Sequence, residues 1–256
     1  MKRIALVGGA GRMGQSLGEN LNLIDEMVVS VLVDLNEPRH LFGATYHSTL
    51  DEVDPHSVDV VVDFSQPDSV VLSAQWCARH HVGLVIGATG LSEFQRQSVL
   101  DASQQTGIIM ASNFSLGAVL SERFAAMAAP YFDRVEIIEL HHDRKVDSPS
   151  GTSIATAQRV RDARAVAGRH TPGEPTQRDT IEGARGADAG DGVRIHSVRL
   201  PGLVAHQEVL LGGPGEGLTI RHDSYDRVSF VQGVAIAVAH VDATPGFTWG
   251  IDDLIA

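Results

Sequence analysis

Short apolar runs alternate with helical patterns over the first 112 residues. The runs at 4–7, 28–33, 58–64, 84–86 and 108–111 predict buried strands. Between them, Met13, Leu17 and Leu21 recur at four-residue spacing, and residues 68–80 and 92–105 carry further helical patterns. Strands that alternate with helices are typical of an α/β fold with a parallel, doubly wound sheet.

The pattern changes after residue 113, where a second module is expected. Helical spacing covers 116–129, and an alternating strand follows at 135–140 with Val135 and Ile137 as its first apolar positions. Residues 168–192 are rich in Gly, Pro, Asp and Arg and predict a long loop. Short strands are expected at 193–200, 208–211 and 218–222, and an apolar helix at 231–241.

Composition narrows the class of partner. A formal charge of −12 argues against nucleic acid, although a few local cations could still bind an anionic small molecule. Cys77 is the single cysteine, which fits a reducing compartment. The apolar run at 4–7 is too short for a signal peptide or a membrane span, so we expect a cytoplasmic protein without membrane contact.

A glycine-rich turn joins the first strand to the first helix. Gly9, Gly11 and Gly14 have the spacing of a dinucleotide-binding loop, in which the backbone approaches a pyrophosphate. Asp34 ends the second strand twenty positions after Gly14, where a carboxylate can accept hydrogen bonds from a ribose. The sequence therefore predicts a Rossmann-type domain. Arg12 and Arg39 could meet a 2′-phosphate, which leaves the choice between NADH and NADPH open.

Residues 139–152 concentrate the groups that can carry chemistry. His141, His142, Lys145 and the turn Ser150-Gly151-Thr152 can supply a proton and several donors for carboxylates. The turn precedes a helical pattern, so its amides could point at an anion. The residues alone also allow a metal site at the histidine pair or a solvated polar loop. A neighbouring lysine and the remote cysteine disfavour the metal.

The run His-His-x-x-Lys-x-Asp-x-Pro-Ser-Gly-Thr closely resembles the signature of the dihydrodipicolinate reductase family. The resemblance extends through the glycine loop, 63–65, 87–90, 113–115 and 198–230. It implies NADH- or NADPH-dependent reduction of a cyclic dicarboxylate, 4-hydroxy-tetrahydrodipicolinate, by way of dihydrodipicolinate to tetrahydrodipicolinate, in the route to diaminopimelate and lysine. It also implies a dinucleotide-binding domain at 1–112 completed by 223–256, an α+β substrate and oligomerisation domain with a mixed sheet at 113–222, and a homotetramer.

The resemblance assigns roles residue by residue. His141 would be the general acid and Lys145 a second proton donor or electrostatic partner. The substrate carboxylates would be held by His142, Lys145, Ser150, Gly151 and Thr152. The cofactor would be bound by Gly8, Gly9, Ala10, Gly11, Arg12, Met13, Asp34, Phe64, Gly87, Ala88, Thr89, Ala111, Ser112, Asn113 and Phe114, with Arg227 near the nicotinamide. No metal is expected.

Three positions depart from the family pattern. Ala88 and Ser65 each stand where the family usually has Thr, and Ser148 stands where Ala is common. Ala88 removes a hydroxyl near the expected nicotinamide, so cofactor affinity or preference could differ. Two other functions remain as alternatives: a related oxidoreductase acting on another imine or a semialdehyde, and a catalytically silent dinucleotide sensor.

Overall fold

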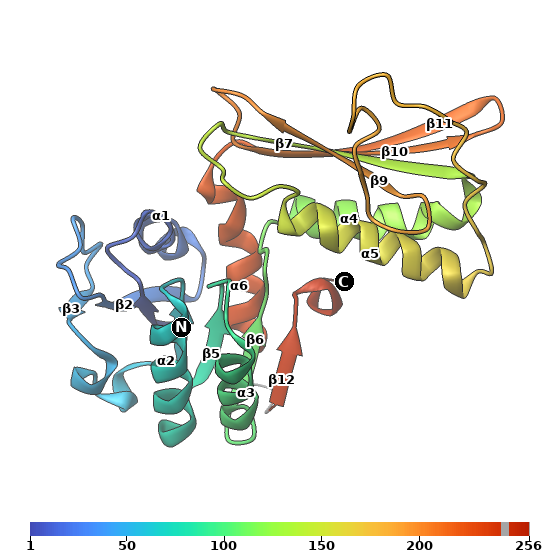
Figure 1. Cartoon of the computed structure of the whole chain (residues 1–256). Helices are drawn as coiled ribbons and strands as arrows, with labels where there is room; N and C mark the ends of the chain where they lie inside the picture. The colour runs from blue at the N-terminus through green and yellow to red at the C-terminus, as the bar shows by residue number, and fades with distance from the viewer. Residues whose placement is uncertain (242–245, 256) are drawn as a thin grey trace. The chain divides into compact units, whose positions relative to one another are not determined.

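The structure, a computed structural model, describes residues 1–241 and 246–255 (Figure 1). It divides into two compact units, Met1–Ser115 with Arg227–Ala256, and Leu116–Asp226. The C-terminal part of the expected dinucleotide-binding domain includes 242–245 and 256, which lie outside the described residues. Within the described ranges, no helix is long and apolar enough to cross a membrane.

The first unit contains a fully parallel seven-stranded sheet, so the expected doubly wound sheet is confirmed. Its order is β12-β6-β5-β4-β1-β2-β3. The strands are β1 (Lys2–Val7), β2 (Met27–Val33), β3 (Thr45–His47), β4 (Val60–Asp63), β5 (Gly83–Ile86), β6 (Gly107–Met110) and β12 (Gly246–Trp249). The sequence patterns did not predict β3 and β12, the short strands at the two edges.

Helices cover both faces of this sheet. One face packs on α2 (Pro67–His80) and α3 (Glu93–Ala102), with Val70, Cys77 and Val99 in the shared core. Alternate strand residues such as Leu6 and Val85 point the other way and are also fully buried. The helices α1 (Arg12–Asn20) and α6 (Val231–His240) pack against β1 and β5. Burial on both faces explains why these strands are continuous apolar runs.

The second unit is a five-stranded mixed sheet with two helices (Figure 1). Its order is β11-β10-β7-β9-β8, in which only β7 and β9 run parallel. One face is covered by α4 (Leu116–Ala128) and α5 (Gly151–Val166). The strands are β7 (Arg134–His141), β8 (Ala187–Asp188), β9 (Arg194–Arg199), β10 (Ala205–Gly213) and β11 (Glu216–Ser224). The expected long loop is confirmed, with β8 as its one regular element in the described chain.

Short 3₁₀ helices connect the longer elements. They are η1 (Leu21–Leu23), η2 (Leu50–Glu52), η3 (Pro55–Ser57), η4 (Ala129–Tyr131), η5 (Arg227–Phe230) and η6 (Asp252–Leu254).

A buried arginine on α5 fixes the connection between α4 and β7. The Arg164 side chain is 1% exposed, and its guanidinium donates to the backbone oxygens of Ala129, Phe132 and Asp133 at 3.0, 2.6 and 3.2 Å. These carbonyls lie where the chain leaves α4, beyond its regular helical bonds, and Ala129 O also accepts from the Phe132 amide at 3.4 Å. Arg164 therefore bonds three backbone oxygens of this connection with one side chain.

Candidate active site

The glycine loop lies at the carboxyl end of β1. Gly8 has φ +82°, and its amide donates to Val33 O at 2.9 Å. A Cβ added to Gly14 would lie 2.1 Å from Gly8 O, so no larger residue fits there. Gly11 caps α1 without a side-chain hydrogen bond to the first-turn amides. These features fit a pyrophosphate that approaches the backbone and accepts from the helix N-terminus.

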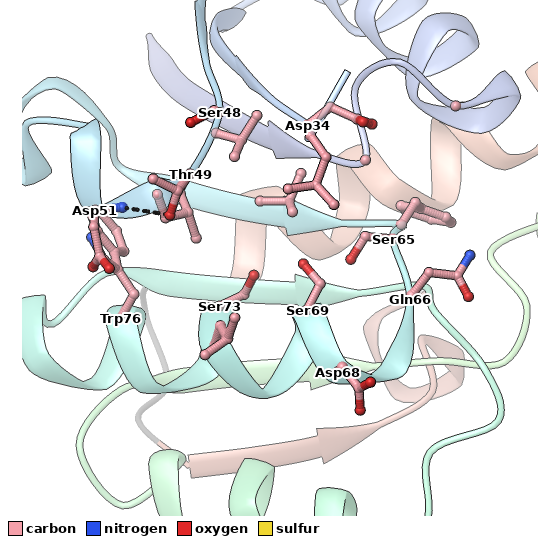
Figure 2. A pocket seen from close by; sticks show the side chains of 18 of the residues that line it. Asp34, Ser48, Thr49, Asp51, Ser65, Gln66, Asp68, Ser69, Ser73 and Trp76 are labelled. Atoms are coloured by element: carbon pink, nitrogen blue, oxygen red, sulfur yellow. Dashed lines mark hydrogen bonds between the residues drawn. The ribbon is translucent and has the colours of Figure 1, made fainter. Parts of the chain in front are cut away.

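Asp34 lies beside this loop at the end of β2. Its Oδ2 accepts from the Ala10 amide at 3.0 Å, and its Oδ1 accepts from the Asn36 amide at 3.0 Å. These bonds fix the carboxylate at the wall of a cavity of about 630 Å³ (Figure 2). Gly8, Gly11 and Phe64 also line this cavity. The cavity volume lies within the range of small-molecule and cofactor sites.

Sequence reasoning missed the rest of this cavity wall. The wall continues along α2 and the turn after β3, two segments that the glycine motif does not mark. Its further polar members include Ser48, Thr49, Asp51, Ser65, Gln66, Asp68, Ser69, Ser73, Gln75 and Arg79, with Trp76 at one end (Figure 2). Asp51 is paired with Arg79 at 3.2 Å, and Asp68 accepts from Gln95.

The other predicted cofactor residues follow the carboxyl ends of β4, β5 and β6. Phe64 packs on Phe114 with ring centroids 5.6 Å apart, and a Cβ on Gly87 would lie 2.1 Å from the Phe64 ring. Ala88 and Ala111 are buried, Asn113 is half-buried, and Thr89 and Ser112 are exposed. None of Gly87, Ala88, Thr89, Ala111, Ser112, Asn113 and Phe114 lines the cavity. Arg227 is exposed at the start of η5 and does not line it either.

A buried carboxylate supports the loop after β4. Asp63 is fully buried and accepts from the Ser65 amide at 2.8 Å, from Ser65 Oγ at 2.5 Å and from Ser73 Oγ at 2.6 Å. Burial raises the pKa of Asp63, and the three hydrogen bonds oppose that rise. Asp63 thereby fixes Ser65 at the cavity wall.

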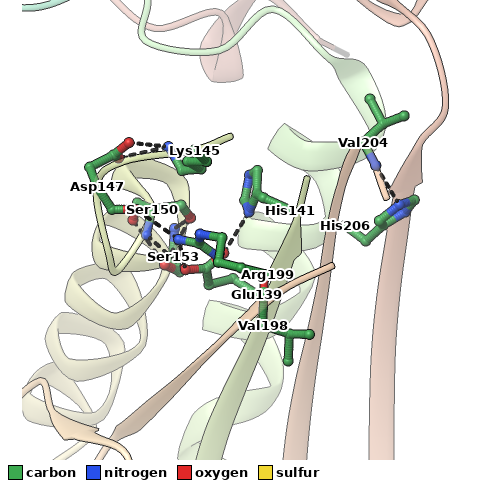
Figure 3. Close-up of polar contacts among 10 residues, drawn as sticks. All are labelled: Glu139, His141, Lys145, Asp147, Ser150, Ser153, Val198, Arg199, Val204 and His206. Atoms are coloured by element: carbon green, nitrogen blue, oxygen red, sulfur yellow. Dashed lines mark hydrogen bonds and ion pairs between the residues drawn. The ribbon is translucent and has the colours of Figure 1, made fainter. Parts of the chain in front are cut away.

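In the second unit, His141 lies at the end of β7, next to an ion pair between Glu139 and Arg199 (Figure 3). His141 Nδ1 lies 2.5 Å from Glu139 Oε2, and Glu139 is fully buried. Arg199, at the end of β9, donates to both Glu139 oxygens at 2.8 Å. Sequence reasoning gave Glu139 and Arg199 no role. The available signal was the acidic residue that continues the apolar alternation of Val135 and Ile137.

The turn before α5 contacts the same carboxylate. Ser150 is the N-cap of α5 and accepts from the Ser153 amide at 3.2 Å. Its own amide donates to Glu139 Oε1 at 3.3 Å, so this predicted anion donor already has a carboxylate partner. Gly151 and Thr152 follow in the first turn of the helix, where backbone amides favour an anion.

Lys145 and His142 complete the cluster of predicted residues. Lys145 Nζ lies 2.8 and 2.7 Å from the two oxygens of Asp147, and its side chain is 20% exposed. Among the described residues, His142 Nδ1 is buried without a hydrogen-bond partner. A buried polar atom of this kind is costly unless a ligand or water satisfies it. The structure therefore brings His141, Lys145 and Ser150 together, with His142 adjacent in the chain.

Burial, hydrogen bonds and neighbouring charges shift the pKa values of Glu139 and His141. Burial tends to raise the pKa of Glu139, but hydrogen bonds from Arg199, Ser197 and His141 outweigh it, so the pKa lies below its ordinary value. Burial lowers the pKa of His141, Glu139 raises it, and the positive charges of Lys145 and Arg199 lower it. The net pKa of His141 lies below 6.5. In the described part of the chain, no group of three or more His, Cys, Asp or Glu side chains could hold a metal ion.

Comparisons with known proteins agree with these features. Two family models match, dihydrodipicolinate reductase N-terminus over residues 2–114 and C-terminus over residues 117–255. The 4-hydroxy-tetrahydrodipicolinate reductase of Nocardia farcinica is 43% identical over 256 residues, covering 99% of this chain and 98% of the relative. The enzyme of that name from Lysinibacillus sphaericus is 42% identical over 266 residues and covers 99% of each chain.

Solved structures show the same fold. Dipicolinate-bound dihydrodipicolinate reductase from Paenisporosarcina sp. TG-14 is 38% identical, with a TM-score of 0.87 over 100% of both chains. GenD2 from gentamicin A biosynthesis, solved in complex with NAD, shares the fold at 17% identity and a TM-score of 0.64, covering 99% of this chain and 90% of that one. The first unit matches a reductase family model and has a Rossmann-type fold, which together imply a nicotinamide cofactor. With both family models matched and relatives above 40% identity along its length, the chain belongs to the dihydrodipicolinate reductase family.

Proposed function

We propose that this chain reduces 4-hydroxy-tetrahydrodipicolinate to tetrahydrodipicolinate in diaminopimelate and lysine biosynthesis. Loss of water gives dihydrodipicolinate, which then receives one hydride and one proton. The observation that carries the proposal is the cluster of His141, Lys145 and the first turn of α5, because it joins a proton donor to several groups that bind carboxylates.

His141 is the proposed proton donor. Its Nδ1 is occupied by Glu139, so Nε2 is the nitrogen left to face a reacting atom. Lys145 supplies positive charge beside it, as a second proton donor or an electrostatic partner. When bound, the reduced nicotinamide supplies the hydride.

The substrate carboxylates are assigned to Lys145, His142 and the start of α5. Gly151 and Thr152 offer first-turn amides, and Ser150 caps the helix that presents them. His142 Nδ1, buried without a partner among the described residues, supplies a further donor when it is protonated. Dipicolinate in the related Paenisporosarcina structure supports a dicarboxylate as the ligand.

The cofactor is assigned to the first unit, with NADH preferred over NADPH. The glycine loop, Asp34 and the loops after β4, β5 and β6 are the proposed contacts. Asp34 can accept ribose hydroxyl bonds, and its charge and that of Asp68, which also lines the cavity, would repel a 2′-phosphate, whereas Asp51 is paired with Arg79. Arg12 and Arg39 are both exposed and could offset part of that repulsion.

The second unit is proposed to bind substrate and to join subunits into a homotetramer. The sheet face opposite α4 and α5 carries Ile138, Leu140 and Leu210, which are only partly buried within one chain. Light scattering should give the mass of four copies; a monomer would remove this assignment. The free thiol of Cys77 favours a reducing compartment, so we propose the cytoplasm as the location.

A coupled assay tests the proposed reaction. Substrate is generated by a synthase from an aldehyde and pyruvate, and oxidation of NADH and of NADPH is followed separately by absorbance. Synthase without this protein is the control. Turnover that requires the protein supports the proposal, and no oxidation of either cofactor would overturn it.

A further inference from the structure

One carboxylate in the second unit connects the general acid to the anion-binding turn. Glu139 is fully buried, and its two oxygens receive His141 Nδ1, two nitrogens of Arg199 and the Ser150 amide. These donors leave the Glu139 carboxylate little freedom to rotate. A displacement of Glu139 would therefore move both the imidazole and the first residue of the turn.

Arg199 fixes the other side of the same turn. Besides its two bonds to Glu139, Arg199 donates from Nη2 to the backbone oxygen of Asp147 at 2.8 Å. Asp147 and Ser150 are the ends of the segment 147–150 that leads into α5, so the pair Glu139–Arg199 holds this segment at both ends. A lysine could not make these contacts, because it lacks the planar fork of donors.

The pair also determines which nitrogen of His141 carries the proton. A carboxylate only accepts hydrogen bonds, and Arg199 keeps Glu139 ionised, so His141 Nδ1 must donate. The neutral ring then has its lone pair on Nε2, and the protonated ring has a second, transferable proton there.

We infer that Glu139 and Arg199 are positioning residues for the proposed reductase reaction, orienting His141 and the turn at Asp147–Ser150 as one unit. The inference rests on that proposed function. It assigns no contact with substrate to either residue.

The same strand offers a matched control. Glu136, on the opposite face of β7, binds Arg185 at 2.5 and 3.3 Å and His196 at 2.7 Å. It has the same partner types as Glu139, but they lie outside the cluster of His141. Glu136→Gln therefore measures the cost of breaking a Glu–Arg–His group on this strand.

The test compares Glu139→Gln, Glu139→Asp and Glu136→Gln. Glu139→Gln should lower kcat by about ten- to a thousandfold, less than loss of the imidazole itself, with little change in NADH binding. The charged groups facing His141 are Glu139, Lys145 and Arg199, and removing the negative one lowers the pKa of His141. The pH above which activity falls should therefore move down. Glu139→Asp should recover part of kcat. Glu136 lies on the face proposed to join subunits, so the mass of Glu136→Gln is checked by light scattering; with the assembly intact, this variant should change neither quantity.

A second measurement does not depend on catalytic turnover. Proton–nitrogen spectra of the unsubstituted protein should show the neutral His141 ring protonated on Nδ1, and its titration should move down in Glu139→Gln alone. The inference would be overturned if the neutral His141 ring carried its proton on Nε2. It would also be overturned if Glu139→Gln had the same kcat and the same His141 pKa as the control Glu136→Gln. If Glu139→Gln does not fold, Arg199→Lys decides: unchanged kcat and titration would overturn the inference, and a lower kcat with intact NADH binding would support it.

These results stay separate from the test of the reaction itself. A protein that shows no turnover of the dicarboxylate before any substitution contradicts the proposed function. Turnover that does not depend on Glu139 or Arg199 contradicts only their positioning role.

Discussion

Lys145 Nζ lies within 2.8 Å of both carboxylate oxygens of Asp147, so the cation assigned to the substrate already has an anionic partner. A substrate carboxylate must compete with Asp147 for it. We predict that Asp147→Asn tightens binding of pyridine-2,6-dicarboxylate by about two- to fivefold, the range of an exposed ion pair. Calorimetry measures this, with Asp143→Asn as the control for charge in the same loop. Equal effects of the two substitutions would argue against specific competition.

His141→Gln should lower kcat by roughly ten- to ten-thousandfold with a modest change in KM, because it removes general acid catalysis. Lys145→Ala should impair both kcat and KM, since Lys145 also binds the substrate. The affinity for NADH, measured by fluorescence, should be nearly unchanged in both proteins, because the glycine loop and Asp34 are intact. A His141 variant with normal turnover, or one that also loses NADH, would show that the proton donor lies elsewhere.

The pH dependence follows from the direction of the His141 shift. The pKa of His141 lies below 6.5, and a general acid works only when protonated. The value of kcat/KM, which reports the free enzyme, should therefore fall as pH rises through the lowered pKa of His141. Steady-state kinetics across this range measure the effect. In His141→Gln, kcat/KM should no longer fall over this pH range. If the fall remained, another group would be responsible for it.

Asp34→Asn should raise the efficiency with NADPH relative to NADH. The asparagine keeps an acceptor for one backbone amide but loses the charge that repels a 2′-phosphate. The ratio of kcat/KM for the two cofactors should shift toward NADPH by about tenfold, which corresponds to roughly 1.4 kcal/mol. Asp25→Asn, an exposed site outside the cavity, serves as the control. An unchanged ratio would mean that Asp34 does not bind the adenosine ribose.

Arg164→Leu should destabilise the protein by roughly 2–4 kcal/mol, because one buried and two part-buried backbone oxygens lose a charged donor. Urea unfolding measures the free energy. The exposed Arg178→Leu is the control for loss of a positive charge. A difference below about 0.5 kcal/mol between the two would mean that other donors replace Arg164.

The sequence predicted what is local in the chain. The glycine turn, the strands buried on both faces and the run from His141 to Thr152 each lie within a few residues, so their spacing carries the signal. The two edge strands, β3 with Thr-Tyr-His and β12 with Gly-Phe-Thr-Trp, contain no continuous run of apolar residues and pair on one side only, so no strand pattern marks them.

The missed site residues come from distant segments. Arg199 meets Glu139 across 60 positions, through the parallel pairing of β9 with β7. The alternation of β7 placed Glu139 on the buried face, but it did not predict which cation would pair with this carboxylate and offset the cost of burying its charge. Likewise, the wall from Ser48 to Asp51 depends on β3, so the extent of the cavity followed only from the fold.

The parallel pairing of β12 with β6 affects the order in which the chain can be assembled during synthesis. The strand that completes the first sheet, and α6 that covers one of its faces, follow the entire second unit in the sequence. Until residue 249 has left the ribosome, β6 has an unpaired edge and Val85 lacks part of its cover. Nascent chains stopped near residue 226 should therefore depend on chaperones, while a chain extended past β12 should resist proteolysis.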